Sequence, residues 1–153
     1  MSITLRTPTV WDARIYDKLY RSNPDIQFYV SDMGRENLTQ VALLMDSYAR
    51  LDFINDHAYI IEDTIFGPVG AMQALANKDY KSLDMQFFIG NAYRNCGYMQ
   101  EAIKLFASVL KSTSYYSLLF DISKRNIPAT NLVVKLGAET IDGIEKVQYE
   151  LVI

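Results

Sequence analysis

Three apolar-rich runs in the middle of the chain constrain its fold more than any other feature. They cover Ala58 to Glu62, Val69 to Leu75 and Leu83 to Ile89, and Gly67-Pro68 separates the first two. Short apolar runs bounded by turn residues are typical of strands. We therefore expect these three segments to form the centre of a sheet.

The segments before these strands have helical periodicity. Ile3 to Arg6 alternates as a strand does, and Thr9 is a plausible helix cap. After it, one apolar face of a helix is predicted at four-residue spacing by Trp11, Ile15 and Leu19. A second helix is expected around Asn37 to Tyr48. The first third of the chain should thus be mainly helical.

The second half repeats the alternation of helix and strand. A helix is expected beyond Gly97, and Tyr116 to Ile122 has the pattern of a buried strand. Pro128 suits the first turn of the next helix, and Gly137 suits the position just past its end. Asp142-Gly143 predicts a final hairpin. With no repeat and no linker, we expect one mixed α/β domain that covers residues 1–153.

Composition excludes several classes of protein. The one cysteine, Cys96, cannot form an intramolecular disulfide, and one Cys with one His cannot supply a metal cluster. The first residues do not resemble a secretion signal, and no apolar stretch approaches the ~20 residues of a membrane span. A net charge of -3 with scattered Lys and Arg does not favour nucleic acid. We therefore expect a cytoplasmic protein with no nucleic-acid or membrane partner.

The stretch from Phe87 to Ala102 is the most informative for function. A buried strand runs through a polar loop directly into a helix. A helix N-terminus leaves backbone N–H groups unpaired and carries partial positive charge, so such a loop can hold a phosphate. Gly97 would let an anion approach the backbone closely, and Arg94 could add charge at the rim. The alternative is a strand-to-helix turn that needs a glycine and binds nothing.

These residues resemble the GNAT superfamily of acyl-CoA N-acyltransferases. The frame Arg94-x-x-Gly97-x-Met99 is similar to the family's cofactor loop, although the family prefers Gly or Ala where Met99 stands. The run that begins at Gly97 is also similar to the branch that contains ribosomal-protein N-terminal acetyltransferases. Downstream, Asn126-x-x-Ala129 resembles the family's second motif. Two motifs at the family's usual separation make the resemblance more specific than either alone.

The resemblance implies a mostly antiparallel, twisted sheet of six to seven strands flanked by about four helices. It also implies an N-acetyltransferase that moves an acetyl group from acetyl-CoA, its cosubstrate, to a primary amine by direct attack. Backbone N–H groups would stabilise the oxyanion. By position in the motifs, the residues that would contact the cofactor are Phe87, Phe88, Ile89, Arg94, Asn95, Cys96, Gly97, Tyr98, Met99 and Asn126.

The catalytic groups are less defined than the cofactor loop. Glu62 and Asp84 are the candidates for a general base, because both are polar residues on central strands, although strand alternation alone explains them. Val133 stands where many family members carry a Tyr that protonates the leaving thiolate. The tyrosines that could replace it, none of them assigned, are Tyr93, Tyr98, Tyr116 and Tyr149. His57 is expected to lie in an exposed loop.

Several alternatives stay open at this stage. Met99 and Val133 also fit a catalytically weak or inactive binding domain of the same fold. The acceptor could be a peptide N-terminus, a polyamine, an aminoglycoside or an amino acid. Both a monomer and a homodimer remain possible, since an exposed edge strand near the C-terminus would permit pairing.

Overall fold

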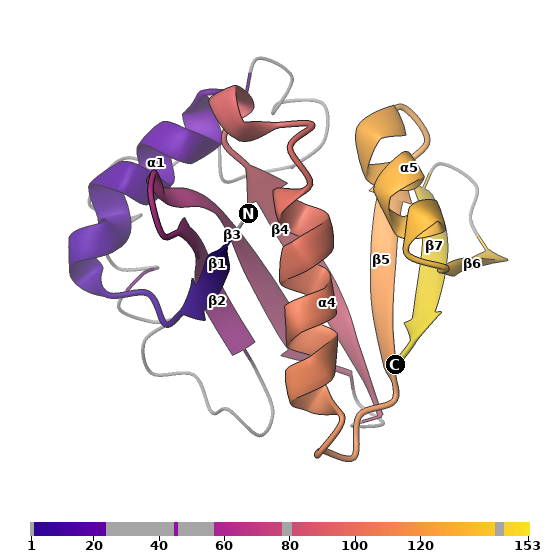
Figure 1. The fold of residues 1–153 in the computed structure, drawn as a ribbon. Coiled ribbons are helices and arrows are strands. Elements are labelled where there is room, and N and C mark those ends of the chain that lie inside the picture. The colour runs from indigo at the N-terminus through magenta and orange to yellow at the C-terminus, as the bar shows by residue number, and fades with distance from the viewer. Residues whose placement is uncertain (1, 24–44, 46–56, 78–80, 143–145) are drawn as a thin grey trace.

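A seven-stranded sheet runs through the molecule in the order β1-β2-β3-β4-β5-β7-β6 (Figure 1). The computed structural model describes residues 2–23, 45, 57–77, 81–142 and 146–153. Every neighbouring pair of strands is antiparallel except β4 and β5, which are parallel. The predicted mixed, mostly antiparallel sheet is therefore confirmed. The strands are β1 (Ile3–Arg6), β2 (His57–Asp63), β3 (Gly67–Ala76), β4 (Ser82–Ile89), β5 (Ser117–Ser123), β6 (Glu139–Asp142) and β7 (Lys146–Val152).

Three α-helices are described: α1 (Ala13–Arg21), α4 (Tyr98–Leu110) and α5 (Ile127–Lys135). Short 3-10 turns precede two of them, η1 (Val10–Asp12) before α1 and η3 (Asn91–Tyr93) before α4. In Figure 1, α4 and α5 stand side by side in front of the sheet. The expected helix around 37–48 lies outside the described residues, apart from the helical Met45.

The core is divided between the two faces of the sheet. Strand side chains alternate between faces, so neighbours such as Ile60 and Ile61 enter different clusters. Ile61 belongs to the larger cluster, which packs under α4 and α5 and includes Phe106 and Val133. Ile60 belongs to the smaller one, where Tyr16 of α1 and Met45 are buried. Each strand residue of a site therefore faces either the cluster under α4 and α5 or the cluster with α1.

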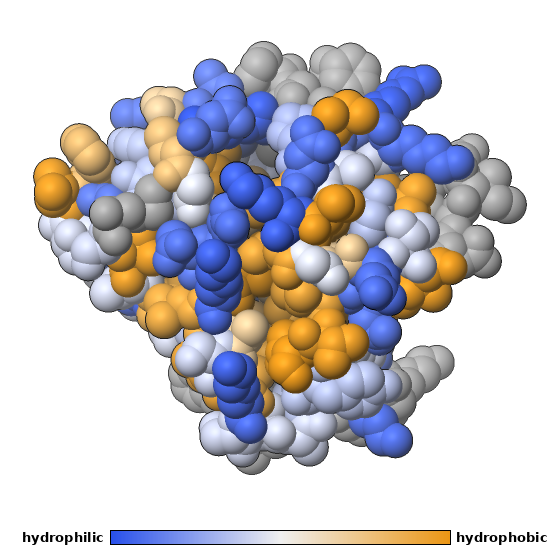
Figure 2. Space-filling view, turned by 45° about the vertical axis from the view of Figure 1, so that its right-hand side comes forward, coloured by the Kyte–Doolittle hydropathy of each residue, from blue (hydrophilic) through white to orange (hydrophobic). Residues whose placement is uncertain are grey.

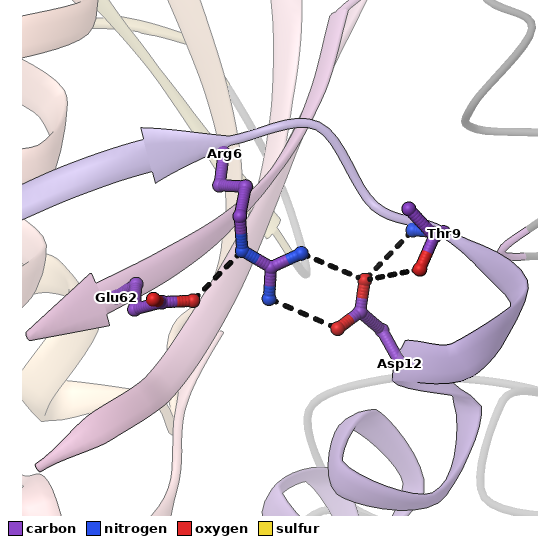
Figure 3. Close-up of polar contacts among 4 residues, drawn as sticks. All are labelled: Arg6, Thr9, Asp12 and Glu62. Carbon is purple, nitrogen blue, oxygen red and sulfur yellow. Dashed lines mark hydrogen bonds and ion pairs between the residues drawn. The ribbon is translucent and has the colours of Figure 1, made fainter.

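The edge of the sheet at β1 is closed by a network of charged side chains (Figure 3). The guanidinium of Arg6 donates two hydrogen bonds to Asp12, at 2.9 and 3.0 Å, and one to Glu62 at 2.7 Å. Asp12 also accepts from the backbone N–H of Thr9 at 2.7 Å. Burial would raise the pKa of Asp12, but its hydrogen bonds to Arg6 and Thr9 outweigh that effect and lower it. The network ties β1 and β2 to the start of α1.

Two expectations for individual side chains are wrong. Trp11 is 89% exposed, because it lies in the 3-10 turn and the four-residue spacing of an α-helix does not extend to it. The buried face of α1 consists of Ala13, Tyr16, Leu19 and Tyr20. His57 is 4% exposed rather than in an exposed loop, because β2 begins at that residue and its ring packs against Phe106.

Candidate functional site

The parallel strands β4 and β5 separate halfway along their length. They pair from Ser82 with Ser117 to Asp84 with Leu119, and no pairing between them is described beyond that point. β4 continues to Ile89 and β5 to Ser123. The two ribbons diverge toward the top of Figure 1. The edge of β4 from 85 to 89 thus offers backbone N–H and C=O groups that β5 does not use.

A cavity of about 790 Å³ fills the space where the strands diverge. Both strands line it, together with the loop before α4, the first turn of α5 and the end of α1. Its volume is within the ~300–1,000 Å³ of typical small-molecule sites. Figure 2, turned so that the right-hand side of Figure 1 comes forward, shows hydrophobic side chains in the middle of this face and hydrophilic ones around them.

The loop from Arg94 to Gly97 turns its backbone toward the cavity. Asn95 and Gly97 both have positive φ, 61° and 83°, which only glycine adopts at little cost. The positive φ of Gly97 lets the chain turn at the N-cap of α4. The first hydrogen bond within α4 joins the N–H of Glu101 to the carbonyl of Gly97 at 3.1 Å. The amides of residues 98–100 therefore have no partner within the helix.

The side chains of this loop differ in their burial. Met99 is 6% exposed and packs in the core beneath α4, so the departure from the family's Gly or Ala adds no bulk to the loop. Cys96 is exposed, and its Sγ contacts the carbonyl oxygen of Arg94 at 3.4 Å. Arg94 lines the cavity. All the loop residues predicted from the motif, 94–99, lie on the cavity wall.

A buried hydrogen bond anchors the start of α4. The hydroxyl of Tyr98 donates to Asp63 at 2.8 Å, and the other carboxylate oxygen of Asp63 accepts from the backbone N–H groups of Ile65 and Phe66. The amides of Phe66 and Ile65, followed by Tyr98, lower the pKa of Asp63. The hydrogen bond to Asp63 raises the pKa of Tyr98 to about 12. The Tyr98 hydroxyl therefore has its hydrogen-bond acceptor within the fold, at Asp63.

Asn126 lies across the cavity at the start of α5. Its Oδ1 accepts from the backbone N–H of Ala129 at 3.2 Å and so caps the helix. The residue also lines the cavity. With Oδ1 in use, the amide Nδ2 is the group that can reach a ligand. The remaining predicted contacts, Phe87, Phe88 and Ile89, lie on the part of β4 that does not pair with β5, and they line the cavity as well.

The structure separates the two candidate bases. Asp84 lines the cavity at the point where β4 and β5 part, and its Oδ1 accepts from Asn77 Nδ2 at 3.3 Å. Glu62 instead bonds to Arg6 near the β1 edge of the sheet, and it does not line the cavity. Of the two, only Asp84 lies beside the unpaired edge of β4.

Among the four tyrosines considered, Tyr93 and Tyr98 line the cavity, whereas Tyr116 and Tyr149 do not. Val133, at the position of the family's Tyr, is fully buried in the core under α5. Val133 itself does not line the cavity.

Sequence reasoning did not name the individual residues at the end of α1 that line the cavity. Tyr16, Tyr20 and Asn23 line it, and the rings of both tyrosines contact Phe88 edge-on at 5.1 and 5.2 Å. The available signal was the aromatic pair at i and i+4, which marks one helix face. The four-residue spacing of Trp11, Ile15 and Leu19 predicts a different face, of which only Leu19 is buried. Residues 2–23 thus supply part of the site and not only the fold.

Two further observations bear on the class of site. Among the described residues, no three His, Cys, Asp or Glu side chains lie close enough to hold a metal ion. The helices within the described ranges are too short or too polar to cross a membrane.

Comparisons with known proteins agree with this geometry. The family model for the acetyltransferase (GNAT) domain matches residues 2–139. Among curated proteins, no sequence matches this chain. An acetyltransferase from Thermus thermophilus superposes with a TM-score of 0.82 at 17% identity, over 100% of this chain and 98% of that one.

Two other solved structures share the fold. The microcin C7 self-immunity acetyltransferase, in complex with acetyl-CoA and AMP, gives a TM-score of 0.81 at 15% identity, over 99% of this chain and 92% of that one. A putative ribosomal-protein-serine acetyltransferase from Vibrio cholerae gives 0.77 at 14% identity, over 99% and 94%. The sheet opens between β4 and β5, a loop with glycine at the N-cap precedes α4, and the family model matches nine-tenths of the sequence. The chain therefore belongs to the GNAT family of acetyltransferases.

Proposed function

We propose that this protein transfers an acetyl group from acetyl-CoA to a primary amine in the cavity between β4 and β5. The observation that carries the proposal is that two sets of available backbone groups lie on the same cavity, the edge of β4 that β5 leaves open and the amides that open α4. An extended cofactor arm can hydrogen-bond along the first, and a diphosphate can bind at the second.

The roles of the binding residues follow from their places. The amides that follow Gly97 would hold the diphosphate, with the Arg94 guanidinium at the rim. The edge of Phe87 to Ile89 would hold the pantetheine arm and the acyl carbonyl. Asn126 Nδ2 would contact the arm from the opposite wall. These residues bind and orient the thioester and keep its carbonyl beside backbone donors.

In the reaction, the neutral amine attacks the thioester carbon, the new C–N bond forms and the C–S bond breaks. The oxyanion that develops is stabilised by backbone N–H groups of β4. The proton of the amine passes to Asp84, directly or through one water, and coenzyme A leaves as the thiolate. Asp84 is proposed as the base because it lies at the fork, the point where β4 and β5 separate, and lines the cavity there. Tyr98 is given no acid role, since its hydroxyl bonds to Asp63.

The proposal is tested by thiol release from acetyl-CoA in the presence of spermidine, an aminoglycoside, a serine-terminated peptide or a free amino acid. Wild-type protein should release thiol with at least one of these amines, and the Gly97→Glu variant should not. Coenzyme A and acetyl-CoA at millimolar concentration should raise the thermal midpoint. Protein that neither binds the cofactor nor releases thiol with any amine would refute the proposal.

One observation favours a second candidate, a binding domain with little or no catalysis. Val133 is fully buried where the family carries its acidic Tyr, and neither Tyr116 nor Tyr149 lines the cavity in its place. This candidate predicts a thermal shift with coenzyme A but no thiol release above the rate without enzyme. The same two assays therefore separate the candidates.

A further inference from the structure

The C-terminal end of α1 is held against the end of β4. A Cβ at Gly90 would lie 2.5 Å from Leu19 Cδ2, so the two chains meet here because position 90 has no side chain. One turn further on, the backbone N–H of Asn91 donates to Ser22 Oγ at 2.9 Å. The residue that follows, Asn23, is thus fixed at the wall of the cavity.

Asn23 is 2% exposed, and its side-chain amide has a defined orientation. Its Nδ2 contacts the carbonyl oxygens of Leu19 and Tyr20 at 3.4 and 3.3 Å. Because both partners are acceptors, the nitrogen must face them and the oxygen must face away. In the part of the chain that the structure describes, Asn23 Oδ1 is buried and has no hydrogen-bond partner.

A buried carbonyl oxygen without a partner destabilises the fold, because it gives up hydrogen bonds to water and gains none. Such a group is therefore explained best by a partner that arrives with a ligand. A carbonyl oxygen only accepts, so the ligand atom must carry an N–H or O–H.

The surroundings of Asn23 place it near the acyl end of the cavity. Tyr16 and Tyr20 pack edge-on against Phe88, which belongs to the part of β4 that does not pair with β5. Side chains at every second position of a strand point to the same face, so Asp84, Gln86 and Phe88 share one face of β4. This is the face toward α1, whereas Met85 and Phe87 pack in the cluster under α4 and α5. A ligand N–H or O–H that bonds to Asn23 Oδ1 would thus lie on the same side of the sheet as Asp84, the proposed base.

We propose that Asn23 binds the acceptor substrate, its Oδ1 accepting a hydrogen bond from an N–H of the amine while the rings of Tyr16 and Tyr20 form the adjoining wall. The inference rests on the proposed acetyl transfer to amines and names the residue that selects the amine. It assigns acceptor binding to the end of α1 and cofactor binding to the loop before α4. Substitution at Asn23 should therefore affect the two substrates differently.

The test compares wild type with Asn23→Leu, which keeps the branched shape and the number of heavy atoms of the side chain and removes the acceptor. The KM for whichever of spermidine, the aminoglycoside, the peptide or the amino acid is acetylated should rise about tenfold or more, the size of a lost hydrogen bond to a charged or polarised N–H. The KM for acetyl-CoA should not change. The thermal midpoint of the free protein should stay level or rise, since an unpaired buried carbonyl has been removed. A structural role for Asn23 predicts a lower midpoint.

Ser117→Ala is the matched control. Ser117 is fully buried on β5, and its Oγ likewise has no partner among the described residues, but it does not line the cavity. Its removal should leave the KM values of both substrates unchanged. A control that raised the amine KM as much as Asn23→Leu would overturn the assignment.

The inference and the proposed function fail in different ways. If no amine gives thiol release, the result counts against acetyl transfer. In that case wild type and Asn23→Leu are still compared by calorimetry, which measures how each coenzyme A complex binds the same four amines. Acetylation or binding that is equal in the two proteins overturns the role of Asn23. So does a coenzyme A complex that binds none of the four amines.

Discussion

At the β1 edge of the sheet the polar groups pair with one another, whereas at the fork between β4 and β5 they face a cavity. Arg6, Asp12 and Glu62 form a network in which each charge has a partner within 3.0 Å. Beyond Asp84, β4 still pairs with β3 but no longer with β5, and the amides that open α4 have no partner within the helix. The first arrangement contributes stability, and the second leaves hydrogen-bonding capacity for a ligand.

The comparison teaches that the two regions should respond to substitution in different measurements. Changes at the β1 edge should alter the free energy of unfolding and leave ligand binding intact. Changes at the fork should alter binding or catalysis and have smaller effects on unfolding. The predictions below are ordered by the expected size of effect.

Gly97→Glu should have the largest effect, a loss of coenzyme A affinity of about a hundredfold or more. The side chain would bring a carboxylate to the amides that bind the diphosphate, and at least two charge-assisted hydrogen bonds would be lost. The measurement is calorimetric titration with coenzyme A. Gly137→Glu is the control for backbone strain, because Gly137 also has positive φ, 96°, with open space around it. Equal losses in both variants would mean that strain, not the anion site, explains the result.

Asp84→Asn should lower kcat about a hundredfold, in the range of a lost general base, with the acetyl-CoA KM unchanged. Steady-state thiol release with an acetylated amine measures both constants. Glu62→Gln is the matched change at the other candidate base, and its kcat should equal that of wild type because Glu62 bonds to Arg6. A Glu62→Gln variant that loses more activity than Asp84→Asn would reverse the proposed roles.

Arg6→Met should destabilise the fold by about 1–2 kcal/mol at neutral pH, because the buried Asp12 carboxylate loses its partner. The value is at the low end because the Arg6 side chain is 37% exposed. Urea unfolding measures it, and coenzyme A affinity should stay at the wild-type value. A destabilised variant that also lost the cofactor would show that the two regions are coupled.

The Arg6→Met penalty should also depend on pH. The pKa of Asp12 is lowered in the folded state, so its stabilisation is present above its unfolded pKa of about 3.9 and is lost as the pH falls through the folded value. The difference between Arg6→Met and wild type should therefore shrink below about pH 4. A penalty that stays constant into acid would exclude the ion pair as its cause.

Tyr98→Phe should have the smallest effect at the fork, a loss of coenzyme A affinity of roughly two- to tenfold, the size of one hydrogen bond. It removes the hydroxyl that fixes the start of α4 to Asp63. The KM for acetyl-CoA should rise while kcat holds, since the hydroxyl takes no part in proton transfer. A drop in kcat without a change in KM would instead indicate that Tyr98 acts as the acid.

The sequence predicted much of this arrangement because local patterns determine it. β1 was predicted from Ile3 to Arg6, where it lies, and the loop before α4 was predicted from Gly97 and the periodicity that follows. Asn126 was found by its motif. In each case the signal lies within a few residues of the element that it specifies.

The misses share a physical cause, which is that tertiary packing decided them. His57 is buried because it begins a central strand beneath Phe106, and no local pattern records that contact. Local pattern does not distinguish the surroundings of Glu62 from those of Asp84, because these depend on which strand edge pairs with β1 and which edge β5 leaves open. Asn23 entered the site through the approach of α1 to Gly90, a contact between positions about seventy residues apart.

The central claim is that coenzyme A binds where the sheet opens and α4 begins, and a crystal structure of the coenzyme A complex tests it most directly. The account predicts diphosphate oxygens about 2.7–3.2 Å from backbone nitrogens among residues 97–100, with the pantetheine arm along the free edge of β4. A diphosphate bound elsewhere, or a pantetheine arm that does not touch residues 85–89, would contradict it.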